Sequence, residues 1–533
     1  MTPSTPGGWS VISGVALIMI SAAIVGTWPL CILMLALYRR AVARGMRRTG
    51  PVLVEPPAFA PAPVAAGTRP PIQVIEAGTG PTSPLLGAIR RRGRGTRLIF
   101  GLAGLSYALG AVVVFSVIEE LEWLPMRTLS LAILFGWPLV PTLLALAPPG
   151  RRMRVLVLLG AALAVVGLLL GVGLPVGQAV LLIALLVALP AIFVLATSAR
   201  TLRGAAWLAA PGLALLGLVL WLISPVVTVW QWGGGFGLWS LSRVLVGVAL
   251  LALLPAYGFL VAHVYSAKWA SDESLWMIQW WFVATVPLAL FIGVNGWRAA
   301  VVGMAPYVLF LLVLLVGAMR FRPQPVRPVR LLLLRTFGDR HRSTRLLRDV
   351  VRQWRWIGSV ELITAPDVAT ETLEPDEFLD FLRGALARRF VTDTSQVSER
   401  LAGLDLLPDR DGRFRINELM CHDDTWRPTV HGLIGAVDVV LLDLRGFTAG
   451  NAGVVEELER LTALVPLRRV VVLIDETTDF TALQHALQHA AVMAPPWSPL
   501  VNDPFPALKA VSRPHERGGS HRLLTALVAA AQG

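Results

Sequence analysis

The chain has 533 residues, of which 55% are hydrophobic and 15% are charged, and its formal net charge is +13. This composition is too apolar for an ordinary soluble enzyme and excludes that class. Long apolar runs fill the sequence up to about residue 319, whereas residues 320–533 are of mixed charge. We therefore expect a polytopic α-helical membrane domain followed by a sizeable soluble domain.

Nine apolar runs are long enough to cross a bilayer, because roughly 20 helical residues span a hydrocarbon core ~30 Å thick. The first differs from a cleaved signal peptide, since no Lys or Arg precedes it, and it predicts a span whose N-terminus lies outside. The runs cover approximately residues 11–37, 98–118, 128–148, 155–173, 176–198, 205–224, 239–264, 275–294 and 300–319.

Basic residues predict the orientation of these spans, because Lys and Arg concentrate in cytoplasmic loops. Eleven Arg lie in the loop of residues 38–97. Further basic residues follow the third, fifth, seventh and ninth spans, and the loops on the other side carry few. This alternation predicts a cytoplasmic C-terminal domain, and the bias toward Arg, Ala, Leu and Gly is typical of a bacterial inner-membrane protein.

The positive charge does not predict a nucleic-acid partner. Residues 38–97 contribute +9 of it, as eleven Arg minus Glu55 and Glu76. A basic block between two spans fits the lipid bilayer better, since each charge near anionic headgroups is worth ~1 kcal/mol. Within this block, residues 49–88 are rich in Pro and Ala and predict an extended, mostly disordered loop.

These patterns divide the chain into four predicted regions. The regions are the N-terminal region with the first transmembrane helix (1–37), the basic cytoplasmic loop (38–97), an eight-helix transmembrane domain (98–321) and a cytoplasmic α/β domain (322–533).

The interiors of the predicted spans hold almost no ionisable side chains. Transporters usually bury charges there, so the sequence favours an anchor or sensor over a transporter.

Within the last region, strands alternate with helices, which predicts a doubly wound parallel sheet covered on both faces. In such sheets, ligands bind beyond the carboxyl ends of the strands. We expect the loops at residues 334–339 and 443–453 to meet there. The predicted strands are 329–334, 359–363, 437–442 and 469–474, and the predicted helices are 343–356, 375–390, 426–433 and 453–464.

Short motifs carry a resemblance to a known family. The sequence has Leu-Arg-x-Phe-x-Asp at 334–339, a helix led by Trp426, an apolar strand, and Gly-x-x-x-Glu-Leu at 453–458. This order resembles the TIR-like domains of bacterial multi-pass membrane proteins and, more distantly, the nucleoside 2-deoxyribosyltransferases. The resemblance covers residues 329–475. It implies a TIR/flavodoxin-like fold and, in active relatives, cleavage of the nicotinamide–ribose bond of NAD.

The resemblance also assigns roles to individual residues. Glu457 falls on the position of the catalytic helix-borne Glu, and Arg335, Phe337 and Asp339 match the substrate-binding loop after the first strand. NAD would be the substrate, and no cofactor is expected. The sequence departs from the family at two places: Glu456 replaces a frequent aromatic residue, and only Thr-Ala-Pro-Asp at 364–367 follows the second strand.

Two interpretations of Glu457 stay open. Apolar residues at helical spacing form an inward stripe that Glu457 borders, so the carboxylate could hold ribose hydroxyls or stabilise an oxocarbenium-like transition state. Alternatively, it is an acid in the first helical turn, favoured by the helix dipole by ~0.3–1 kcal/mol. The stripe consists of Val454, Leu458, Leu461 and Val465.

The remaining candidates have structural alternatives as well. Arg335 and Asp339 could bind phosphate and ribose or form an ion pair, and Asp443 is the better of two acids flanking the third strand. Cys421 and the His485/His489 pair lack further ligands at metal spacing, so no metal is expected. Two functions compete: hydrolysis of NAD or a related N-glycoside, and a non-enzymatic module for signalling or self-association as a homo-oligomer.

Overall fold

The computed structural model describes residues 26, 29–47, 71–77, 84–146, 238–295, 297–320, 327–335, 350–364, 373–422, 424–512 and 519–532, and a few isolated positions between 159 and 212. The chain divides into two compact units. The helical unit contains Met1–Tyr38, Arg94–Arg322 and Thr370–Arg383, and the α/β unit contains Arg39–Gly93, Pro323–Ala369 and Gly384–Gly533.

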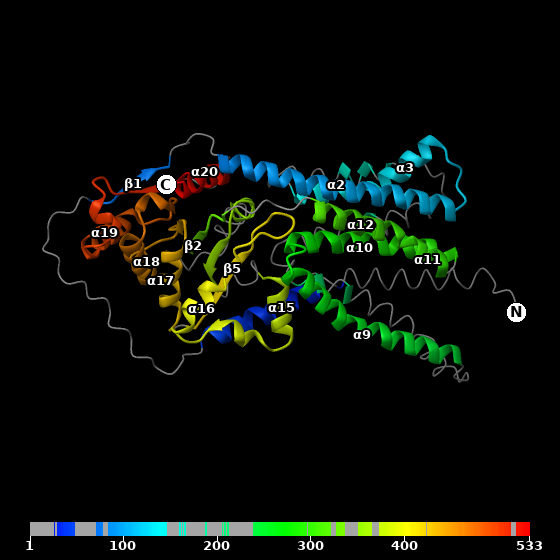
Figure 1. Ribbon diagram of the computed structural model, residues 1–533, viewed down its shortest axis with the longest axis horizontal. Coiled ribbons are helices and arrows are strands. Elements are labelled where there is room, and N and C mark those ends of the chain that lie inside the picture. The colour runs from blue at the N-terminus through cyan, green and yellow to red at the C-terminus, as the bar shows by residue number, and fades with distance from the viewer. Residues whose placement is uncertain are drawn as a thin grey trace. The chain divides into compact units, whose positions relative to one another are not determined.

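Several predicted spans correspond to helices of the structure (Figure 1). The run at 128–148 is interrupted at Pro138, which lacks an amide hydrogen, and the run at 300–319 also forms two helices. Most of 11–37 and nearly all of 155–173, 176–198 and 205–224 lie outside the described residues. The helices are α2 (Pro84–Ile118), α3 (Pro125–Gly136), α4 (Leu139–Ala145), α9 (Leu238–Ser266), α10 (Asp272–Ile292), η2 (Gly293–Asn295), α11 (Trp297–Gly303), α12 (Ala305–Arg320) and α15 (Pro375–Leu382).

Aromatic side chains fill the core of the helical unit. The Trp281 ring stacks on Phe310, with 4.9 Å between ring centroids, and Tyr107 meets Trp281 edge to face at 4.8 Å. The indole of Trp281 also donates a 3.0 Å hydrogen bond to the Thr142 hydroxyl, which satisfies its polar atom in the apolar core. Among the described residues, two helical stretches are long and apolar enough to cross a membrane, Pro84–Ile118 and Arg298–Arg320.

The α/β unit is built on a sheet of eight parallel strands in the order β1-β8-β7-β6-β2-β3-β5-β4. The parallel sheet of the prediction is therefore confirmed. Its central run, β3-β2-β6-β7-β8, has the strand order of flavodoxin-like folds. The strands are β1 (Gln73–Glu76), β2 (Leu331–Arg335), β3 (Val360–Ile363), β4 (Phe390–Val391), β5 (Ile416–Cys421), β6 (Val439–Asp443), β7 (Val470–Leu473) and β8 (Ala507–Val511).

Alternating side chains of the central strands supply two cores. Leu332 and Leu334 of β2 belong to the cluster that α17, α18 and α19 cover, whereas Leu331 and Leu333 belong to the cluster covered by α20 and the first turns of α2. Because both faces are buried, β2, β6 and β7 consist almost entirely of Val and Leu. The helices of this unit are η3 (Leu386–Arg389), α16 (Gln396–Ala402), α17 (Trp426–Ala436), α18 (Ala452–Leu464), η4 (Leu467–Arg469), α19 (Phe480–Met493), η5 (Pro499–Asn502) and α20 (Gly519–Ala531).

The prediction of an extended, disordered loop over 49–88 is wrong at two places. Residues 73–76 form β1, which pairs in parallel with β8 at the edge of the sheet. Helix α2 begins at Pro84, and Leu86 is buried in the core of the α/β unit. The apolar residues Ile72 and Val74 pack against the other core, and their burial outweighs the Pro- and Ala-rich composition around them.

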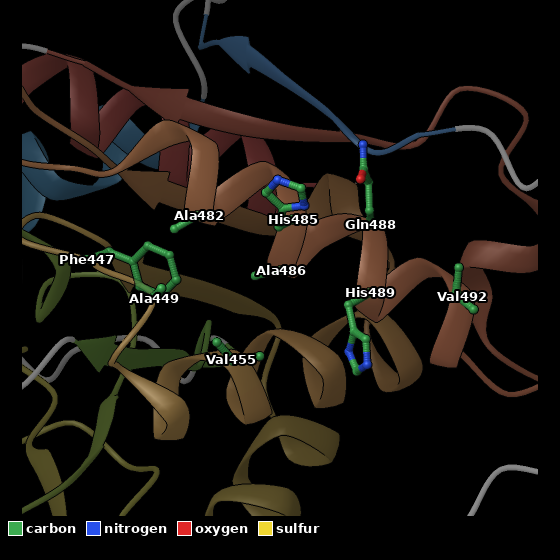
Figure 2. A pocket seen from close by; sticks show the side chains of 9 residues that line it. All are labelled: Phe447, Ala449, Val455, Ala482, His485, Ala486, Gln488, His489 and Val492. Carbon is green, nitrogen blue, oxygen red and sulfur yellow. The ribbon is translucent and has the colours of Figure 1, made fainter.

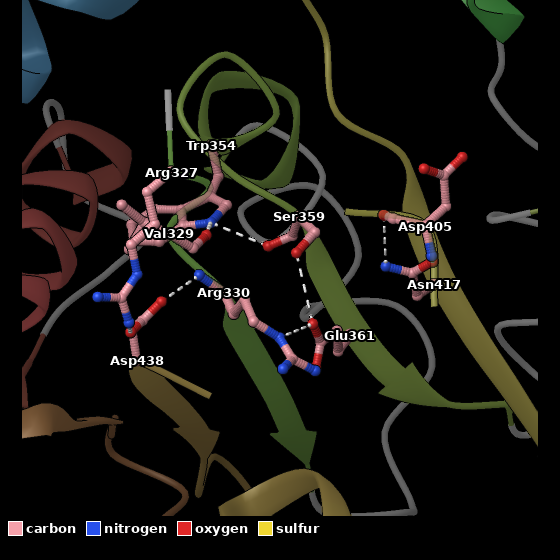
Figure 3. A network of polar contacts seen from close by, with 9 residues as sticks. All are labelled: Arg327, Val329, Arg330, Trp354, Ser359, Glu361, Asp405, Asn417 and Asp438. Atoms are coloured by element: carbon pink, nitrogen blue, oxygen red, sulfur yellow. Dashed lines mark hydrogen bonds and ion pairs between the residues drawn. The ribbon is translucent and has the colours of Figure 1, made fainter. Parts of the chain in front are cut away.

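A polar network ties together the amino ends of three neighbouring strands (Figure 3). The Arg330 guanidinium donates to both carboxylate oxygens of Glu361, at 2.7 and 2.9 Å, and the Arg330 amide donates to Asp438 at 2.9 Å. Glu361 is fully buried, and burial raises the pKa of its carboxyl although Arg330 opposes the shift. These charges lie opposite the carboxyl edge and hold strands, so we assign them a structural role.

Candidate functional site

The carboxyl edge of the sheet has a switch point between β2 and β6. Arg335, the last residue of β2, is in register with Asp443, the last residue of β6. After β2 the chain continues to β3 on one side, and after β6 it continues to β7 on the other. In doubly wound sheets such a point forms the ligand-binding crevice. Of the predicted loop, Phe337 and Asp339 lie outside the described residues, and only the backbone of Arg335 is described.

Asp443 is held in a buried ion pair that the sequence did not predict. Both of its oxygens accept hydrogen bonds from the Arg445 guanidinium, at 2.8 Å from Nε and 2.7 Å from Nη2. Both side chains are nearly inaccessible, at 2% and 3% exposure. A carboxylate that already accepts a bidentate guanidinium has little capacity left for ribose hydroxyls. The geometry therefore favours a role for Asp443 in positioning Arg445 and the loop that follows β6.

That loop is anchored to the loop after β7. Gly446 has a φ of +74°, a backbone conformation that favours glycine, and its amide donates to the Thr477 hydroxyl at 2.9 Å. The Thr478 hydroxyl donates to the Leu444 carbonyl at 3.1 Å, and the Asp479 amide donates to the Phe447 carbonyl at 3.0 Å. These bonds fix the path of the chain into α18, the helix that carries Glu457.

Glu457 lies in the second turn of α18, because the helix begins at Ala452. The prediction of a first-turn position is therefore wrong. Since the effect of the helix dipole falls off within the first turn, the dipole interpretation loses support. Glu457 is buried, with 6% of its surface exposed. Its position beside the inward stripe is confirmed, because Val454, Leu458, Leu461 and Val465 are all buried in the same core.

No hydrogen bond from the residues that the structure describes offsets the cost of burying the Glu457 carboxyl. Its Oε2 atom is buried and has no hydrogen-bond partner among them. Burial, with a smaller contribution from the charge of Glu456, raises the pKa of Glu457 to about 8. The carboxyl is therefore mostly protonated at neutral pH, as is common for carboxylic acids with catalytic roles.

The neighbouring acids of α18 differ from Glu457. Glu456 accepts a 3.0 Å hydrogen bond from Arg427, and Glu459 lies 2.9 Å from Nδ1 of His489. Both are partly exposed. A partly exposed, paired acid is an ordinary feature of a helix surface. Of the three acids of α18, Glu457 is therefore the one that is neither exposed nor paired with a described residue, and its burial needs another explanation.

Trp426 heads α17 and lies beside the start of α18. Its ring is half-buried and packs against the core cluster, and the position of a Cβ on Gly453 would be 3.7 Å from the indole. The Arg427 guanidinium lies 5.4 Å from the centre of the same ring. These contacts give Trp426 a packing role.

An open hollow of about 690 Å³ lies between α18 and α19, next to the loop after β6 (Figure 2). A second hollow, of about 550 Å³, lies between β1 and α19. Glu457 lines neither of them. The first hollow is lined by Phe447, Ala449, Val455, Ala482, His485, Ala486, Gln488, His489 and Val492.

Metal-ligating side chains do not gather within the described parts of the chain. In those parts, no three His, Cys, Asp or Glu residues approach closely enough to hold a metal ion. Cys421 is buried, and burial raises the pKa of its thiol to about 11, which disfavours the thiolate that metals bind. His489 pairs with Glu459 rather than with His485.

Comparison of the chain with protein-family models, with curated proteins and with solved structures found no match. A functional assignment therefore has to come from the residues and geometry of the candidate site.

Proposed function

We propose that this chain is a multi-pass protein of a bacterial inner membrane whose cytoplasmic TIR-like α/β domain hydrolyses NAD or a related N-glycoside. The observation that carries the proposal is the buried Glu457 carboxyl with an oxygen atom lacking a hydrogen-bond partner among the described residues. It lies on the helix that follows the switch point of a sheet with the flavodoxin-like strand order.

Exposed apolar stripes support the membrane assignment. On α2, leucine and valine side chains three or four residues apart each expose about half of their surface. A helical face of this kind is unfavourable in water and suits contact with lipid tails. The alternation of basic loops predicts nine spans with an outside N-terminus, a topology that would put the α/β unit in the cytoplasm. The stripe consists of Leu98, Leu102, Leu105, Leu109, Val113 and Val117.

In the proposed reaction, the bond between ribose C1′ and the nicotinamide nitrogen breaks, and the electron pair leaves with neutral nicotinamide. Water adds to C1′ and releases a proton. Positive charge develops on the ribose, and an ionised Glu457 would stabilise it. Because the pKa of Glu457 is raised to about 8, the ionised fraction and the rate should increase from pH 6 to pH 9. The buried Arg445 would contribute by holding the loop before α18 in place.

Two observations favour a second candidate, a non-enzymatic module for signalling or self-association. Asp443 is occupied by Arg445, and neither described hollow is lined by Glu457. In this alternative, Glu457 is a buried acid that destabilises one state of the domain and so sets a conformational equilibrium. The two candidates differ in whether the domain binds a nucleotide.

A thermal-shift experiment on the purified full-length chain in detergent separates the two candidates. At a ligand concentration about 100 times the dissociation constant, binding stabilises the folded state by about 2.7 kcal/mol. We expect NAD and ADP-ribose to raise the melting temperature of the α/β unit, and nicotinamide alone to raise it less. Melting temperatures that stay unchanged with all three, at millimolar concentration, would contradict nucleotide binding and favour the module.

A further inference from the structure

Strand β1 reaches its place in the sheet from a distant part of the sequence. It pairs with β8 from Gln73↔Ala507 to Glu76↔Ala510, although more than 400 residues separate the two strands. It is the last strand of the sheet on that side, and β8 is its sole pairing partner among the described strands. The edge of β8 therefore receives an extended segment that could come from the same chain or from another copy.

Backbone hydrogen bonds join β1 to β8, and Ile72 and Val74 add packing against the core. The Gln73 amide donates to the Pro506 carbonyl at 2.9 Å, and the Ala77 amide donates to the Ala510 carbonyl at 2.6 Å. Of the four strand residues, three are exposed, and Val74 is half-buried. The nearest fully packed side chain is Ile72, with 8% exposure. Backbone pairing of this kind depends little on which molecule supplies the strand.

Packing between β1 and α19 is incomplete. The hollow of about 550 Å³ there is lined by Ile72, Val74 and Glu76 of the strand segment and by Phe480 and Gln488 of the helix, among others. Phe480 exposes 48% of its surface. The open space leaves part of the strand without side-chain contacts, so the ladder to β8 contributes to its position together with the burial of Ile72 and Val74.

The chain on either side of β1 limits where it can go. Residues 47 and 71 are joined by enough chain to span up to ~80 Å, whereas residues 77 and 84 can lie at most ~25 Å apart. The start of α2 is fixed within the α/β unit, because Leu86 is buried in its core. A β1 strand can therefore reach a second copy only if that copy presents its β8 edge close by, as in a two-fold symmetric, edge-to-edge dimer.

We propose that the β8 edge is a strand-acceptor site and that two copies of this chain associate by exchanging residues 71–77 across it. The exchanged strand makes the same hydrogen bonds in either molecule, so effective concentration decides between the two forms. The inference rests on the membrane location of the proposed function, which would concentrate the copies. Strand exchange does not require the proposed enzymatic activity.

Site-specific crosslinking of the full-length chain tests the exchange. In a background with Cys31→Ala and Cys421→Ala, one tagged copy carries Gln73→Cys and a differently tagged copy carries Ala507→Cys. The two copies are co-expressed and treated in membranes with a short bismaleimide. We expect a crosslinked dimer that contains both tags. A double variant with both cysteines in one chain checks the β1–β8 pairing and should also give a crosslinked monomer.

Two substitutions at Ile75 identify the cause of any dimer. Ile75→Pro removes the amide that faces β8 at this register, whereas Ile75→Ala removes a side chain that is 44% exposed and keeps the amide. We expect the mixed dimer to decrease roughly tenfold or more with proline and to persist with alanine. Crosslinking confined to the monomeric double variant, or a mixed dimer that survives Ile75→Pro, would overturn the proposal.

Discussion

The full-length chain with Glu457→Gln is expected to release nicotinamide from NAD at least about a hundredfold more slowly than the unchanged chain. The substituted amide keeps the size of the side chain but cannot acquire the negative charge that opposes the developing positive charge on ribose. Release is measured by chromatography after incubation of the purified chain with NAD. The rate of the unchanged chain should also rise between pH 6 and pH 9, because the pKa of Glu457 is about 8.

Glu456→Gln is the matched control for this substitution. It removes the same chemical group from the adjacent position of α18, but Glu456 is partly exposed and paired with Arg427. We expect the control to keep most of the activity. Equal rates in the unchanged chain and in Glu457→Gln would exclude Glu457 from the reaction. Loss of activity in both variants would indicate that the fold of α18, and not the carboxyl of Glu457, is what the assay reports.

The free energy of unfolding of the α/β unit should fall as the pH rises from about 4.5 to about 8, and Glu457→Gln should remove much of this fall. The ordinary pKa of a Glu is 4.5, and burial raises the folded-state pKa of Glu457 to about 8. Between these values the folded state binds a proton that the unfolded state releases, so stability decreases with pH. The decrease is about 1.4 kcal/mol per pH unit, or roughly 3–5 kcal/mol in total.

Hydrogen exchange of the β6 amides measures this effect. Because β6 is a central strand, its amides exchange when the whole α/β unit unfolds, and their protection gives the free energy of unfolding. At each pH, the protection of Glu457→Gln is compared with that of the unchanged chain, which cancels the intrinsic pH dependence of exchange. Asp409 is buried and has a pKa of about 7, but its contribution is common to both proteins. We expect the variant to be the more stable protein at pH 8 and the difference to vanish near pH 4.5. A constant difference from pH 5 to pH 9 would mean that Glu457 is ionised throughout.

Most of the strands that the sequence predicted have an uninterrupted apolar run. β2, β6 and β7 consist almost entirely of Val and Leu, so their apolar runs predict them directly. β5 was missed because Asn417 and Glu418 interrupt its apolar pattern. In the structure, the Asn417 side chain bonds to the backbone of Asp405, and Glu418 accepts a hydrogen bond from Thr364. These partners lie outside the strand, 12 residues away for Asp405 and 54 residues away for Thr364, and periodicity does not reveal them.

The edge strand β1 and its neighbour β8 were missed for a related reason. β1 contains two polar residues out of four and lies in a Pro-rich segment, and β8 contains Lys509. Their pairing with each other depends on chain positions more than 400 residues apart. Local propensity cannot report such a contact, because the stabilisation comes from the tertiary ladder and from the burial of Ile72 and Leu508.

The candidate site was predicted in part. The order of the motifs placed Arg335 and Asp443 at one edge of the sheet, and the register confirms that their backbones are neighbours. The stripe on α18 placed Glu457 beside the core, and its burial confirms that position. The pairing of Asp443 with Arg445 was not predicted. An Arg two residues after an Asp at a strand end was the available signal, because oppositely charged residues so close in sequence can form a bidentate pair.

Chemical labelling of Glu457 tests the central claim most directly. A carbodiimide reacts with protonated carboxyl groups, so a Glu457 that is protonated at neutral pH and opens into a ligand site should be modified in the full-length chain at pH 7. We expect mass spectrometry to show this modification, and NAD or ADP-ribose to prevent it while leaving the labelling of Glu456 unchanged. A Glu457 that stays unmodified, or one that is modified equally with and without nucleotide, would contradict the account.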